Sequence, residues 1–88
     1  MEVPMDIRFR YVERRKKDLE RCLLSLEKEN FSELEKVGHQ LKGNGVTFGH
    51  AELSAIGSHL EKAANLKDMS SLERALKEFS RWVNQQVN

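Results

Sequence analysis

Hydrophobic residues recur along the chain at the three- and four-residue spacing of amphipathic helices. This spacing predicts four helices, over residues 7–28, 32–48, 51–65 and 70–86, and leaves residues 1–6 as an N-terminal extension. The expected apolar faces consist of Val12, Leu19, Leu23 and Leu26, then Leu34, Val37, Gly38, Leu41, Gly45 and Phe48, then Leu53, Ile56, Gly57, Leu60 and Ala64, and finally Leu72, Ala75, Leu76, Phe79, Trp82 and Val83.

Polar residues and one glycine mark the expected helix ends. Asp6 is available as a cap for the first helix, and Ser32 with Glu35 and Ser70 with Glu73 have the spacing of capping boxes. Gly49 is expected to end or bend the chain. Because the connections are short, consecutive helices should be antiparallel neighbours, which predicts an all-α, up-down-up-down antiparallel four-helix bundle forming a single domain.

The second predicted helix presents a histidine to solvent. At about 100° per residue, His39 lies about 160° from the centre of the apolar face. Gly38 and Gly45 fall on that face, where a missing side chain lets two helices approach closely. Gly43 lies one turn from His39 on the exposed face, where helix stability gives no reason for glycine. Its small size therefore indicates that a partner needs access to the ring.

Lys42 is a surface neighbour of His39, three residues further along the helix. A free imidazole has a pKa of about 6.5 and is mostly neutral and nucleophilic at pH 7. A phosphoryl group on such a ring would carry about two negative charges, which a nearby ammonium can compensate. The pattern therefore predicts a phosphoryl-accepting histidine.

Composition narrows the possible classes of protein. A chain of 88 residues with 33% charged residues and one proline favours helices over strands and is too short for a nucleotide-binding α/β fold. No run of residues is long and apolar enough to span a bilayer, and the N-terminus lacks the features of a signal peptide, so we expect a cytoplasmic protein. Cys22 cannot form an internal disulfide and is expected to be a small buried hydrophobe.

The remaining charged and imidazole groups suggest no further site. The basic run of residues 14–17 spreads around the helix, so we expect solvated head groups there, and a net charge of +1 argues against nucleic acid. His50 and His59 lie about 180° apart on the third helix, so they cannot converge on a metal ion. We place His50 at the helix start and His59 at the edge of the core.

One ordered series of residues runs through positions 37–64, namely His39, Lys42, Gly43, Gly49, Leu53, Gly57, Leu60 and Glu61. The stretch resembles the two central helices of histidine-containing phosphotransfer (HPt) domains, in which an H-x-x-K-G helix is followed by a glycine and an apolar helix with a small residue and an L-E pair. The close match covers about a third of the chain. The outer helices agree only in length and pattern.

The resemblance implies a phosphoryl carrier without enzymatic or nucleotide-binding machinery of its own. HPt domains take a phosphoryl group from a receiver-domain aspartate, or from a kinase, and pass it to another receiver in a multistep phosphorelay. The implied partners are response-regulator receiver domains and a hybrid sensor histidine kinase, with no nucleic acid or membrane partner. No cofactor or metal is expected on this chain, because the Mg²⁺ ion belongs to the receiver. We expect a monomer.

Individual roles follow from the same resemblance. His39 would be the phosphoacceptor, Lys42 the charge partner and Gly43 the residue that gives access, while Gln40 and Val46 would contact the docking partner. Glu61 stands where some family members have a polar amide. Since a carboxylate there would repel a phosphoryl group, we expect Glu61 to point elsewhere.

Two other functional classes remain open. One is a helical bundle of HPt type that docks signalling proteins without being phosphorylated, and retention of both His39 and Lys42 disfavours it. The other is the dimeric histidine-bearing helix pair of a sensor kinase. In those proteins an acidic residue and then a proline typically follow the histidine, whereas here Gln40 follows and the helix has no proline. The sequence does not identify the cognate kinase, the regulator or the direction of phosphate flow.

Overall fold

The computed structural model describes the backbone of residues 5–86 and the side chains of residues 7–86. These residues form four helices and no strand, namely α1 (Met5–Glu27), α2 (Phe31–Thr47), α3 (Ala51–Asn65) and α4 (Met69–Gln86). The all-helical prediction is confirmed. The helix α1 begins two residues earlier than expected and therefore contains Met5 and Asp6, so Asp6 is not the residue that precedes the helix.

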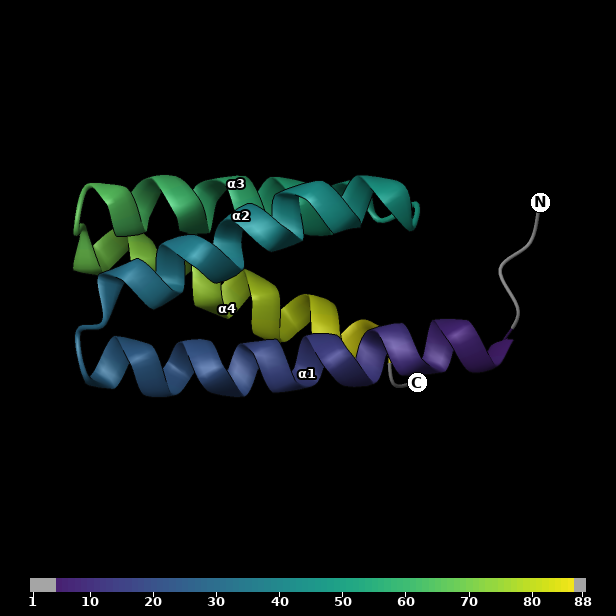
Figure 1. The fold of residues 1–88 in the computed structure, drawn as a ribbon. Helices are drawn as coiled ribbons and strands as arrows, with labels where there is room; N and C mark the ends of the chain where they lie inside the picture. The colour runs from purple at the N-terminus through teal and green to yellow at the C-terminus, as the bar shows by residue number, and fades with distance from the viewer. Residues whose placement is uncertain (1–4, 87–88) are drawn as a thin grey trace.

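Short turns of three residues join the helices (Figure 1). The helices α2 and α3 lie side by side along one side of the molecule, α1 runs along the other, and α4 packs between α1 and α3. The first turns of α1 extend past the ends of the other helices. Gly49 ends the second helix as predicted, with a backbone φ of +79°, a conformation that glycine adopts without steric cost.

Two of the expected capping residues are wrong. At α2 the side chain of Asn30 accepts a hydrogen bond from the backbone N–H of Glu33, so Asn30 is the N-cap in place of Ser32. At α4 the carboxylate of Asp68 accepts hydrogen bonds from both the backbone N–H and the hydroxyl of Ser71. In each case an equally good capping residue lies two positions before the predicted serine, directly before the first residue of the helix.

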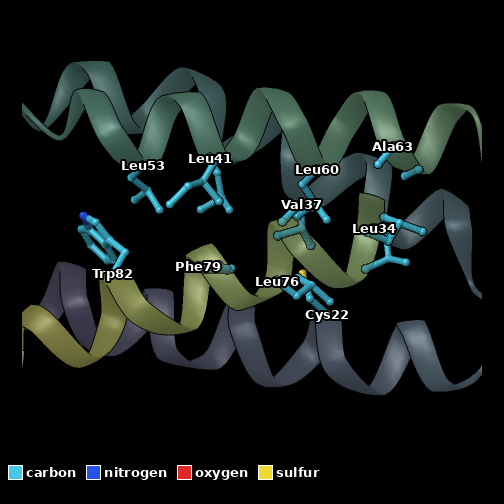
Figure 2. Close-up of a cluster of buried hydrophobic side chains, with 14 of the residues drawn as sticks. Cys22, Leu34, Val37, Leu41, Leu53, Leu60, Ala63, Leu76, Phe79 and Trp82 are labelled. Atoms are coloured by element: carbon cyan, nitrogen blue, oxygen red, sulfur yellow. The ribbon is translucent and has the colours of Figure 1, made fainter. Parts of the chain in front are cut away.

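The core forms between the α2–α3 pair and the α1–α4 pair (Figure 2). The predicted core residues of α3 and α4 are all buried, and so are those of α2 except Phe48. Phe48 lies just after α2 and is 38% exposed. Cys22 is fully buried, as predicted, and burial raises the pKa of its thiol to about 12.

The buried face of α1 agrees only in part with the predicted one. Leu19 and Leu26 are partly buried and pack against the core, as predicted. Leu23 is 50% exposed, whereas Tyr11, Cys22 and Ser25 are buried. The ring of Tyr11 stacks on Phe48 with centroids 4.4 Å apart, and its hydroxyl donates a hydrogen bond of 2.7 Å to Oδ1 of Asn44. These contacts fix the rotation of α1 about its own axis. Hydrophobic periodicity alone does not determine this rotation to better than about one residue.

Arg15 also differs from its expected position. Its guanidinium lies 2.8 Å from the carboxylate of Asp18 and 4.6 Å from the centre of the Tyr11 ring, and only 11% of its side chain is exposed. The prediction of a solvated head group is therefore wrong for Arg15.

Among the described residues, no helix is both long enough and apolar enough to cross a membrane.

Candidate functional site

The helix α2 presents His39 on the face opposite the core. Residues 34, 37, 38, 41 and 45 of this helix are buried, which turns His39, Lys42 and Gly43 outward. The side chain of His39 is 70% exposed and that of Lys42 is 45% exposed. The predicted outward placement of the ring is therefore confirmed.

Glycines bring α3 unusually close to α2 behind this face. A Cβ atom added to Gly57 would lie 2.5 Å from the backbone nitrogen of Lys42, and one added to Gly38 would lie 2.6 Å from the backbone nitrogen of Glu61. Such distances leave no room for any side chain at these two positions. The absence of both side chains allows the two backbones to touch at the level of His39.

This close packing places Glu61 beside the histidine. Glu61 follows Gly57 by one helical turn and therefore lies on the same side of α3, facing α2. Its Oε2 lies 2.7 Å from Nδ1 of His39, and its Oε1 accepts a hydrogen bond of 2.8 Å from Nζ of Lys42. The expectation that Glu61 points elsewhere is wrong, because the helix packing directs it to the ring.

The three side chains form one charged and hydrogen-bonded unit. The hydrogen bonds from Lys42 and from His39 lower the pKa of the Glu61 carboxyl below its usual value, so the group is ionised at neutral pH. A carboxylate only accepts hydrogen bonds, and it therefore favours the tautomer in which Nδ1 of His39 carries the proton. The other ring nitrogen, Nε2, then holds the lone pair, and it has no hydrogen-bond partner within the described residues.

Gly43 leaves open space next to this unit. A Cβ atom added at Gly43 would have no other heavy atom within 4 Å, apart from its own helix and chain neighbours. Packing therefore does not require glycine here, in contrast to Gly38 and Gly57. The residues expected to dock a partner are also accessible, since Gln40 is exposed and Val46 is 67% exposed.

The other candidate residues do not join this unit. His50 is the N-cap residue of α3, as predicted, and its ring stacks on Tyr11 with centroids 5.3 Å apart. His59 is 62% exposed and lies 3.8 Å from the carboxylate of Glu78, so its expected place at the edge of the core is wrong. No group of three histidine, cysteine or carboxylate side chains among the described residues is arranged to hold a metal ion.

Sequence reasoning named Glu61 but placed it away from the site, and so missed its contacts with His39 and Lys42. The signal was present in the pairing of Gly38 with Gly57, since two glycines on facing helices fix which residues meet across the interface. With that register known, Glu61 falls next to His39.

No family model, curated protein or solved structure matches the chain.

Proposed function

We propose that this protein is a histidine phosphotransfer protein of a multistep phosphorelay, with His39 as the phosphoacceptor. The observation that carries the proposal is the exposed His39 ring, whose Nδ1 is held by Glu61 while Nε2 has no hydrogen-bond partner among the described residues. In this proposal the four helices form the up-down-up-down antiparallel bundle of an HPt domain. The chain carries a phosphoryl group and does not act as an enzyme.

The chemistry is a direct displacement at phosphorus. The Nε2 lone pair of His39 attacks the phosphorus of a receiver's phosphoaspartate, the N–P bond forms, and the bond between phosphorus and the aspartate oxygen breaks. The aspartate carboxylate leaves with the electron pair, so no proton has to move. Because Nδ1 keeps its proton, the phosphorylated ring carries a positive charge, which the carboxylate of Glu61 stabilises at hydrogen-bond distance. The same displacement in reverse passes the group to a second receiver.

Lys42 and Gly43 support this transfer in different ways. The ammonium of Lys42 is held within one turn of His39 by its hydrogen bond to Glu61, where it can compensate the charge of the phosphoryl oxygens. The open space at Gly43 lets a receiver approach the ring, with Gln40 and Val46 as neighbouring contacts. The Mg²⁺ ion used in such transfers would be held by the receiver, and a hybrid sensor kinase in the cytoplasm would supply the phosphoryl group.

A transfer assay tests the proposal. The protein is mixed with purified phosphorylated receiver domains from the same genome, and labelled phosphate on the chain is measured. His39→Gln should abolish labelling, whereas His59→Gln should not, because His59 is similarly exposed but lies outside the unit. The label should survive base and be lost in acid, as expected for phosphohistidine. Labelling of the His39→Gln variant, or an acid-stable label, would contradict the proposal.

A second candidate is an adaptor bundle that docks signalling proteins without being phosphorylated. The position of Glu61 favours it, because a carboxylate within hydrogen-bond distance of His39 repels a phosphoryl group that comes close. The same assay separates the two candidates. An adaptor would bind receivers in a pull-down experiment but acquire no label from any phosphorylated receiver.

A further inference from the structure

Charge is distributed unevenly along the chain. Residues 7–17 contain six of the 15 lysine and arginine residues and only one of the 14 aspartate and glutamate residues. The rest of the protein therefore has more carboxylates than cations, although the whole chain has a net charge of +1. The N-terminal half of α1 therefore forms a positive stretch on an otherwise acidic molecule, and its first turns extend past the other helices (Figure 1).

Three of these cations share one face of α1. Arg10, Arg14 and Lys17 are spaced by four and three residues, so they lie next to one another on the helix surface. All three are exposed, and none forms an ion pair with another residue in the described part of the chain. Arg15 and Lys16, in contrast, already pair with Asp18 and Glu13.

Exposed apolar side chains border the same cations. Phe9 is 66% exposed, Ile7 is 42% exposed and Phe48 is 38% exposed. Together with Arg10, Arg14 and Lys17 they line a groove of about 700 Å³ between α1 and the end of α2. We call this surface the basic groove. An exposed aromatic ring beside unpaired cations is typical of a binding surface rather than of a solvated helix face.

The floor of the basic groove is held in place. Tyr11 is only 5% exposed, its ring stacks on Phe48, and its hydroxyl donates a hydrogen bond to Asn44 of α2. These contacts fix the projecting start of α1 relative to α2. A ligand would therefore meet a formed surface and would not have to order it.

We propose that the basic groove binds a short acidic segment of another protein that carries an apolar or aromatic side chain. The carboxylates of the segment would pair with Arg10, Arg14 and Lys17, and its apolar side chain would pack against Phe9 and Phe48. Binding at this groove does not depend on phosphotransfer at His39.

Two other polyanions fit the surface less well. A long nucleic acid would extend beyond the basic groove onto the acidic remainder of the protein and be repelled there. An anionic membrane would have to take up Phe48 as well, but its ring is stacked on Tyr11 and only 38% exposed, so it is not free to insert. A short acidic segment can stay on the three cations, and Glu13, the one carboxylate that lines the groove, already pairs with Lys16.

A peptide-binding experiment tests the proposal. The probe is a fluorescein-labelled ten-residue peptide of aspartate and glutamate with one central phenylalanine, followed by fluorescence anisotropy. We expect saturable binding with a dissociation constant on the order of 10⁻⁴ M or lower, weakened by added NaCl. The double variant Arg10→Glu/Arg14→Glu and the variant Phe9→Ala should each weaken binding, the former by about tenfold or more.

Matched controls separate local from general charge effects. Lys28→Glu/Lys77→Glu changes the net charge by the same amount at exposed lysines away from the groove and should leave binding within about twofold. If the glutamate double variant does not fold, Arg10→Gln/Arg14→Gln takes its place. The proposal is overturned if the peptide does not bind, if the two double variants weaken binding equally, or if ten-nucleotide oligothymidylate or phosphatidylglycerol vesicles bind as tightly as the peptide.

Discussion

Oε2 of Glu61 lies 2.7 Å from Nδ1 of His39, across the contact between α2 and α3. This relationship fixes the orientation of an otherwise exposed ring and determines which of its nitrogens is available. It also couples the histidine to Lys42, because the same carboxylate accepts a hydrogen bond from that ammonium. The chemistry proposed for the protein depends on this arrangement.

The tautomer of His39 should depend on Glu61. At pH 8, where an ordinary imidazole is neutral, we expect the Nδ1–H form to predominate in the wild-type protein. Glu61→Ala should remove this bias and shift the ring toward the tautomer ratio of an unconstrained histidine. Nitrogen-15 NMR of histidine-labelled protein measures both states. Glu78→Ala is the control, because Glu78 approaches a different exposed histidine, His59. An unchanged His39 spectrum in Glu61→Ala would rule out the orienting role.

Replacing Gly43 and replacing Gly57 by alanine should change the free energy of unfolding in opposite directions. Gly43→Ala adds a Cβ atom in open space within a helix and should stabilise the protein by about 0.5 to 1 kcal/mol. Gly57→Ala adds one that would lie 2.5 Å from the backbone nitrogen of Lys42, so the helices must move apart. We expect a loss of about 1 to 3 kcal/mol. Urea unfolding measures both free energies. Equal effects of the two substitutions would contradict the described helix contact.

A large side chain at Gly43 should affect transfer and not folding. Gly43→Leu places bulk on the exposed surface one turn from His39, so a receiver can no longer approach the ring as closely. We expect transfer to slow by about tenfold or more while the urea midpoint stays at or above that of the wild-type protein. If Gly43→Leu unfolds the protein, Gly43 is not on an open face. If transfer is unchanged, access is not its role.

The stability of the protein should fall as the pH is lowered, partly because His50 becomes protonated. Burial, and then the nearby charge of Arg8, lower the pKa of His50 below 6.5. The unfolded chain then binds more protons than the folded protein as the pH falls below about 6.5, so protonation favours unfolding. His50→Phe keeps an aromatic ring against Tyr11 and removes the titrating group, and His50 makes no side-chain cap that would be lost. Unfolding free energies at pH 7.5 and pH 5 should therefore differ less in this variant. An equal difference would contradict the assignment.

Hydrophobic periodicity was sufficient to predict the helices. The six apolar positions expected in α4 are all buried, because an apolar face repeated over several turns allows one orientation only. The caps could not be predicted in the same way. Asn30 and Asp68 compete with nearby serines that have equally good spacing, and only the three-dimensional path of the turn decides between them.

The exposed half of the His39 site could be predicted because it depends on one helix. His39, Lys42 and Gly43 are neighbours on the α2 surface in any regular helix. Glu61 lies in another helix, and its position depends on how α3 is shifted and rotated against α2, which no single helix encodes. The rotation of α1 was missed for the same reason, since Tyr11 and Asn44 meet only in the packed molecule.

The position of the phosphoryl group on His39 tests the central claim most directly. Histidine-labelled protein is mixed with a phosphorylated receiver that donates to it, and nitrogen-15 NMR spectra are recorded before and after transfer. We predict that Nε2 of His39 acquires the phosphoryl group while Nδ1 keeps its proton beside Glu61. Phosphate loss from the receivers with no change at His39, or attachment at Nδ1, would contradict the account.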